Sequence, residues 1–281
     1  TSCKKKKLPE TDLGKVRVPA KLVVVKADNV AAEEALISDI SRFANSQNTV
    51  KQSDLSANSP FHVGLEKLSN SVYMPDGVGR WFYERASGSY TTMLAREGGT
   101  PAKYRYLKTH VVPPSRRLTK TDLAKYLNAW AEHPDLASLG GQKNFARFME
   151  DIGEREKQGE SVVPDAHGFK QMIGKVILFK QIHSLVRPMF PAFQGNVAIY
   201  LVALIAKYHG STIDLTRVWE MQDISSGFKT QIRIWAREVH SALHATANGR
   251  MISEWAKKED CWLALQGKSL TPAADSILEL K

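Results

Sequence analysis

The segment between Ala44 and Asn58 concentrates side chains that both donate and accept hydrogen bonds. Its candidates for a ligand-binding site are Asn45, Gln47, Asn48, Asp54 and Asn58. Amide groups present donors and acceptors together, which suits a base edge, a nucleotide or a phosphate-bearing ligand. The same residue types cap helices and close turns, so a helix C-cap followed by an N-cap is the alternative.

Glu84 and Arg85 form a second polar pair, directly after three consecutive aromatic residues, Trp81–Tyr83. Side chains alternate along a strand, so this run predicts a strand with both faces bulky and at least one face in the core. Arg85 could clamp a phosphate with two hydrogen bonds, and the alternative is an ion pair that ties the strand end to a neighbouring element. We predict that this strand end and the amide-rich segment converge in one pocket under positive potential.

Residues 101–120 contain six basic residues and no acidic residue. The candidates for nucleic-acid contacts in this stretch are Lys103, Tyr104, Arg105, Tyr106, Lys108, Arg116 and Arg117. Cations for phosphates and rings for bases are the composition of a nucleic-acid groove. The alternation over residues 103–107 predicts a strand, so a solvated edge strand blunted by lysines is the alternative.

Lys229, Arg233 and Arg237 recur every four residues, which places them on one stripe of a helix. The stripe could follow a nucleic-acid backbone, or it could be an ordinary solvated face. His240 and His244 continue the spacing, but no third ligand stands out, so we predict no metal site there. No P-loop, nucleophile elbow or convincing Ser/His/Asp set occurs, and catalytic residues are left unassigned.

The 281-residue chain carries a formal net charge of +10, which attracts polyanions such as nucleic acid. Its two cysteines, Cys3 and Cys261, predict no disulfide framework and fit a reducing cytoplasm. The longest apolar run, residues 197–206, is too short to cross a bilayer, so we expect no membrane association. The chain begins at Thr1 without Met, and we expect a fragment of a larger protein.

Apolar periodicity predicts an α+β fold that is mostly α-helical. Residues 1–115 are expected to form a mixed α/β portion with the polar loop. It is expected to contain a strand or strands at 16–25, a strand closed by a turn within 79–90, and helices beginning near Ala31 and Pro60. Residues 116–281 are expected to form a helical domain. Its helices are predicted after the Thr119 cap, after Gly140-Gly141, and at residues 166–182, 194–208, 214–222, 227–247 and 251–265.

Four segments, in this order, resemble the AIPR proteins, the abortive infection phage resistance family of prokaryotic defence proteins. They are residues 16–25 leading to Asn45-Ser46-Gln47-Asn48, then Asp54-Leu55-Ser56-Ala57-Asn58, then Trp81-Phe82-Tyr83-Glu84-Arg85 with Gly88 and Tyr90, and finally residues 119–126 with Gly140–Phe145. The resemblance covers about residues 16–150. The Asn-Gly-x-Gln-Thr motif usual just upstream is absent here, which agrees with a truncated N-terminus, and longer members resemble proteins with a restriction-nuclease-like domain further upstream.

The resemblance implies a cytoplasmic antiphage protein. We expect the chain to bind nucleic acid (DNA or RNA) or a nucleotide, without a cofactor of its own, and to control an effector domain outside this chain. One alternative is a metal-dependent nuclease in which Asp54 and Glu84 hold Mg²⁺. A further alternative is a helical module that forms a homodimer or holds a partner protein.

Overall fold

The computed structural model describes residues 56–272 and 277–280, together with Val24, Asn29, Ala32 and Leu36. Residues 51–281 form one compact unit and residues 1–50 form another. The fold below is that of the larger unit. The strands expected at residues 16–25 and the helix expected near Ala31 lie outside the described residues, except for single positions.

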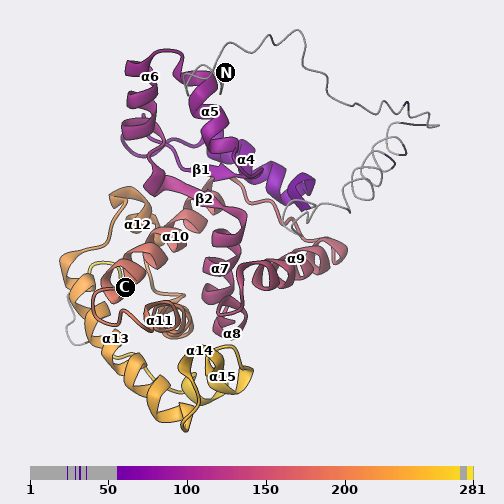
Figure 1. The fold of residues 1–281 in the computed structure, drawn as a ribbon. Coiled ribbons are helices and arrows are strands. Elements are labelled where there is room, and N and C mark those ends of the chain that lie inside the picture. The colour runs from indigo at the N-terminus through magenta and orange to yellow at the C-terminus, as the bar shows by residue number, and fades with distance from the viewer. Residues whose placement is uncertain are drawn as a thin grey trace, which may run out of the picture. The chain divides into compact units, whose positions relative to one another are not determined.

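The first elements of the larger unit surround a small parallel sheet (Figure 1). In chain order they are η2 (Ser56–Asn58), α4 (Pro60–Ser71), β1 (Phe82–Glu84), α5 (Ser89–Gly98), α6 (Pro101–Tyr106), η3 (Leu107–Val111), η4 (Pro114–Arg116) and β2 (Arg117–Thr119). Helices follow: α7 (Lys120–Trp130), α8 (Pro134–Ala137), α9 (Gly141–Lys157), α10 (Ala166–Val186), α11 (Gln194–His209), α12 (Leu215–Met221), α13 (Ser226–Ala247), α14 (Ile252–Trp255) and α15 (Glu259–Leu265). The predicted fold class, mostly helical α+β, is confirmed.

Helix starts follow the side chains that can cap them. The Thr119 hydroxyl accepts a hydrogen bond from the Asp122 N–H at 3.1 Å, as predicted, and α7 begins at the next residue. The same arrangement begins five other described helices, with Ser59 before α4, Thr100 before α6, Asp165 before α10, Asp214 before α12 and Ser225 before α13. A side-chain acceptor satisfies a helix N–H that would otherwise lack a partner, which is why these residue types define the boundaries.

The predicted strand at residues 103–107 is wrong. Thr100 caps this segment by accepting a hydrogen bond from the Lys103 N–H at 3.2 Å, and Pro101 occupies the first helical turn. Proline at this position sacrifices no hydrogen bond and has the backbone angle of a helix. The segment is therefore α6, and it runs into the π-helical turn η3 at Leu107.

The strand β1 separates two hydrophobic cores. It pairs in parallel with β2, with Phe82 opposite Arg117 and Tyr83 opposite Leu118. Trp81 and Tyr83 enter the main core with the helices, while Phe82 packs on a smaller cluster of α5 and η3 residues around Leu107. Both faces of the aromatic run are thus bulky and packed, as predicted, because successive strand residues point to opposite sides.

The main core draws on residues from both sides of position 115. It includes Phe61 and Leu118 together with the centre of α11, where residues 197–205 are all buried. The division into 1–115 and 116–281 stays a prediction. The helix expected at 251–265 is two short helices, α14 and α15, because the chain turns at Ala256–Lys258.

A buried hydrogen bond joins α4 to β1. The Tyr83 hydroxyl and His62 Nδ1 are 2.6 Å apart, and the His62 ring stacks between Tyr83 and Phe145. His62 is fully buried and its Nε2 has no hydrogen-bond partner in the described part of the chain. Burial, with smaller contributions from Lys120 and Arg85, lowers the pKa of His62 to about 3.

The stability of this unit should therefore decrease as the pH falls. An unfolded chain protonates His62 near its ordinary pKa of 6.5, whereas the folded state keeps it neutral down to about 3. Because the unfolded state binds more protons in that window, acid favours unfolding. We expect His62→Gln to remove up to about 1.4 kcal/mol per pH unit from the pH dependence of the unfolding free energy, measured by urea denaturation. His167→Gln, at an exposed position, is the control, and an unchanged slope in His62→Gln would contradict the assignment.

Candidate functional site

Of the predicted ligand-binding residues, Asn45, Gln47, Asn48 and Asp54 lie outside the described residues. Asn58, Glu84 and Arg85 lie inside them. The predicted convergence of the amide-rich segment with the strand end can therefore be followed only at Asn58. There the two groups do meet, since Arg85 Nη1 donates a hydrogen bond of 2.8 Å to Asn58 Oδ1.

Arg85 ties the end of β1 to the elements before it. Its Nε lies 2.7 Å from Glu66 Oε2 on α4, and its Nη1 also donates to the Ala57 carbonyl at 3.1 Å. This is the ion pair proposed as the alternative to a phosphate clamp. About a quarter of the Arg85 side chain remains exposed. The role of Arg85 towards a ligand stays a prediction.

Glu84 is a buried carboxylate with a donor on each oxygen. Its Oε1 accepts from the Gly88 N–H at 3.0 Å, and its Oε2 accepts from Arg117 Nε at 2.5 Å and pairs with Nη2 of the same guanidinium. Gly88 has φ +82°, a conformation in which glycine is favoured. The Arg117 guanidinium lies 5.7 Å from the Tyr90 ring centre. Glu84 therefore holds β2 and the turn before α5, and a metal ion there would have to displace Arg117.

An exposed basic and aromatic surface lies on α6 and η3. We call it the α6 face, and it consists of Lys103, Tyr104, Arg105, Tyr106, Lys108 and His110, all exposed. Within it, Lys108 Nζ lies 6.0 Å from the Tyr104 ring centre, and the Tyr106 and His110 rings stack at 5.1 Å. Lys103, Arg105 and Lys108 have no carboxylate partner among the residues that the structure describes.

The α6 face continues to Arg116, which lines a polar cavity of about 320 Å³. Arg116 Nη1 reaches the His110 carbonyl at 3.4 Å, and it passes so close to Gly79 that a Cβ there would lie 2.6 Å away. Asp76, whose pKa is lowered mainly by the N–H groups of Val78 and Gly79, is also influenced by the Arg116 charge. The carboxylate offsets part of the positive charge at this end.

Lys180 contributes a second cation to the same cavity. Its Nζ donates to the Ser115 carbonyl at 2.6 Å and lies 4.9 Å from the Trp81 ring centre. Burial lowers its pKa. The sequence interpretation missed Lys180. It directly follows the apolar residues 176–179 of α10, which is a usable signal, because an ammonium near a core is costly unless it is hydrogen-bonded or paired.

The basic residues of α13 lie on one stripe of the helix, but one of them is paired with a carboxylate, whereas the cations of the α6 face are not in the described part of the chain. Lys229 pairs with Asp223 at 2.6 Å, Arg233 donates to the Lys229 carbonyl, and Arg233 and Arg237 are exposed. Figure 1 places α13 far from α6, so the two predicted basic sets do not form one surface.

His240 and His244, which extend this stripe, lie with their Nε2 atoms 3.1 Å apart, and Phe190 stacks on His240 at 4.2 Å. Burial and His244 lower the pKa of His240. Within the described ranges, no group of three residues with metal-ligating side chains occurs.

The fold and these surfaces define a basic, mostly helical α+β protein, and none of its described helices has the length and apolarity to span a bilayer. The family model described as AIPR protein matches residues 2–247. The chain therefore belongs to the AIPR family, the abortive infection phage resistance proteins. Comparison with curated proteins and with solved structures gave no match.

The Glu84–Arg117 pair predicts a measurable cost when one partner is removed. Arg117→Met leaves the Glu84 carboxylate buried and without its cation, so we expect a loss of roughly 2 kcal/mol in unfolding free energy, less than for a fully buried pair because Arg117 is partly exposed. Arg147→Met, which breaks an exposed pair with Glu150, should cost less than about 0.5 kcal/mol. Urea denaturation of both variants makes the comparison.

A double variant completes this test. Glu84→Gln combined with Arg117→Met removes both charges, and it should be more stable than the sum of the two single losses implies. Strict additivity would show that Glu84 and Arg117 are not coupled in the folded protein.

Proposed function

We propose that this AIPR-family chain takes part in antiphage defence by binding single-stranded nucleic acid through the α6 face. The observation that carries the proposal is that the cations of this face have no carboxylate partner in the described residues. Several exposed basic side chains elsewhere are paired, as in Arg147–Glu150, Arg155–Glu160 and Lys257–Glu254. Unpaired cations attract phosphates most strongly because no local carboxylate competes for them.

The tyrosines of the face favour single strands over duplexes. Tyr104 and Tyr106 expose 38% and 49% of their surface, so an unstacked base can reach both rings, although Tyr106 is already stacked on His110. Stacking of a base on an aromatic side chain contributes about 1–3 kcal/mol and tolerates any base. In a duplex the bases are already stacked, and only the phosphates would be available to this face.

The cavity at Arg116 and Lys180 lies at one end of the α6 face and could hold a phosphate of the bound strand. Arg116 presents a forked donor, and Lys180 presents a point charge from α10. The negative charge of a bound phosphate would stabilise the Lys180 ammonium and so counteract the decrease in pKa that burial causes. We propose further that binding of nucleic acid to the α6 face and this cavity controls an effector domain outside the chain.

Binding is tested by fluorescence anisotropy with labelled single-stranded DNA, single-stranded RNA and duplex DNA across a salt series. We expect the triple variant Lys103→Ser, Arg105→Ser, Lys108→Ser to bind single strands at least tenfold more weakly. The slope of log K against log salt should fall in magnitude by about 0.7 for each phosphate that the variant no longer neutralises. Tyr106→Ser should weaken single-strand binding and leave duplex binding unchanged.

The matched control removes the same charge from another helix. Lys143, Arg147 and Lys157 are exposed on α9, and changing all three to Ser lowers the net charge equally. Equal weakening by the two triple variants would show that only overall charge matters and would reject the α6 face. Absence of binding to any of the three polymers at low salt would reject the function itself. In the complete protein, loss of protection against phage in the α6 triple variant alone would support control of an effector.

A further inference from the structure

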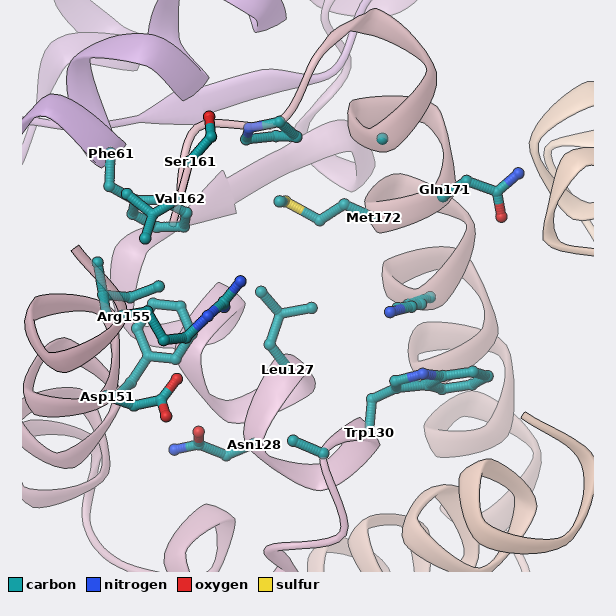
Figure 2. Close-up of a pocket in the computed structure, with 16 residues that line it drawn as sticks. Phe61, Leu127, Asn128, Trp130, Asp151, Arg155, Ser161, Val162, Gln171 and Met172 are labelled. Atoms are coloured by element: carbon teal, nitrogen blue, oxygen red, sulfur yellow. The ribbon is translucent and has the colours of Figure 1, made fainter. Parts of the chain in front are cut away.

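A cavity of about 420 Å³ lies between α7, α9 and the first half of α10 (Figure 2). Figure 2 shows Asp151 and Arg155 reaching in from α9, Leu127 and Trp130 from α7, and Met172 from α10. Val162, from the segment that joins α9 to α10, lies beside Phe61 on another side. The volume falls within the roughly 300–1,000 Å³ range of small-molecule sites in proteins.

Ten of the 16 lining residues are apolar or glycine, and the polar ones are Asn128, Asp151, Arg155, Ser161, Gln171 and Lys175. Phe61, Phe148 and Ile152 are buried core residues that also face this space. Leu127 and Met172 remain partly exposed, although they pack against the core. Apolar walls with few polar groups are typical of sites that take the flat body of a small molecule and orient it by one charged end.

Lys175 is the cation in this cavity without a counterion among the described residues. Its Nζ lies 5.3 Å from the Trp130 ring centre, and among the described residues no carboxylate pairs with it. Burial lowers the pKa of Lys175. The other cation, Arg155, is already paired with Glu160 at 2.8 Å.

We propose that this cavity binds a small aromatic anion, with the anionic group on Lys175 and the ring against Trp130, Leu127 and Met172. An anion there completes the charge pair that the fold leaves open, and a ring fills apolar space that would otherwise hold water. A neutral ligand would leave the half-buried ammonium unpaired. A dianionic ligand would meet the Asp151 carboxylate, which shares the cavity. One negative charge on a flat body therefore fits best.

The site is distinct from the α6 face. The face lies on α6 and η3, whereas the cavity is formed by α7, α9, α10 and Phe61. Figure 1 places α6 and α9 apart. A ligand here and a nucleic acid on the α6 face can therefore be measured separately.

Isothermal titration calorimetry with 3′,5′-cyclic AMP, adenosine and indole-3-acetate tests the proposal. Cyclic AMP and indole-3-acetate each carry one negative charge, as a phosphodiester and as a carboxylate, and adenosine carries none. We expect at least one of the two anions to bind at least tenfold more tightly than adenosine. Lys175→Met should weaken that anion at least tenfold, while Lys170→Met, on the same helix but outside the lining, should leave it within twofold.

A second variant fills the cavity without changing its charge. Ala131 lines the space and is exposed, so Ala131→Trp should fold normally and abolish binding of both anions. Anion affinity unchanged in Lys175→Met, or absence of anion binding to the wild-type chain at millimolar concentration, would overturn the proposal. Loss of anion binding in the α6 triple variant would place the ligand on the nucleic-acid surface instead and would also overturn it.

Discussion

The three residues of β1 are the constraint on which the rest of this unit depends. Tyr83 points into the main core and bonds to His62, while Phe82 points the other way and closes the smaller core. The pairing with β2 is only three residues long, too short to be stable by its backbone hydrogen bonds alone. The ion pair between buried Glu84 and partly exposed Arg117 links the end of β1 to the start of β2. The α6 face continues into η3, whose Leu107 and Val111 belong to the smaller core. Because Phe82 of β1 packs on that core, β1 fixes the position of the α6 face relative to the main core.

Local signals in the sequence were sufficient for most of the helices after residue 119, but they did not indicate α5 and α6 or the contacts that join the elements. Thr119 and Ser59 lie next to the N–H groups they cap, so the boundaries of α7 and α4 could be predicted. The error at residues 103–107 came from weighing alternation above the Thr100-Pro101 start signal, because both patterns fit so short a segment. The partner of Glu84 is 33 residues away at Arg117, and nothing local to Glu84 indicates it.

The candidate site shows the same limit. Arg85 was expected either to bind a phosphate or to form an ion pair, and its partner Glu66 lies on a helix that the sequence places but does not orient. Lys175 and Lys180 were missed because each lies in an apolar run that predicts a buried helix. Only the fold shows that both ammonium groups sit beside tryptophan rings at cavity edges, Lys175 with Trp130 and Lys180 with Trp81.

How strongly the formal net charge of +10 attracts an anion at a given surface depends on which cations there are paired with carboxylates. Paired surface cations contribute little to a distant field, since screening limits each to about a Debye length and its carboxylate cancels most of the remainder. No described carboxylate pairs with the cations of the α6 face, and the Lys175 ammonium lies in a partly desolvated place without a carboxylate partner among the described residues. Phosphate attraction on an open surface weakens steeply with salt, whereas an ion pair inside a cavity is screened much less. The two surfaces should therefore respond differently to ionic strength, which gives a physical basis for telling polymer binding from small-molecule binding in one and the same chain.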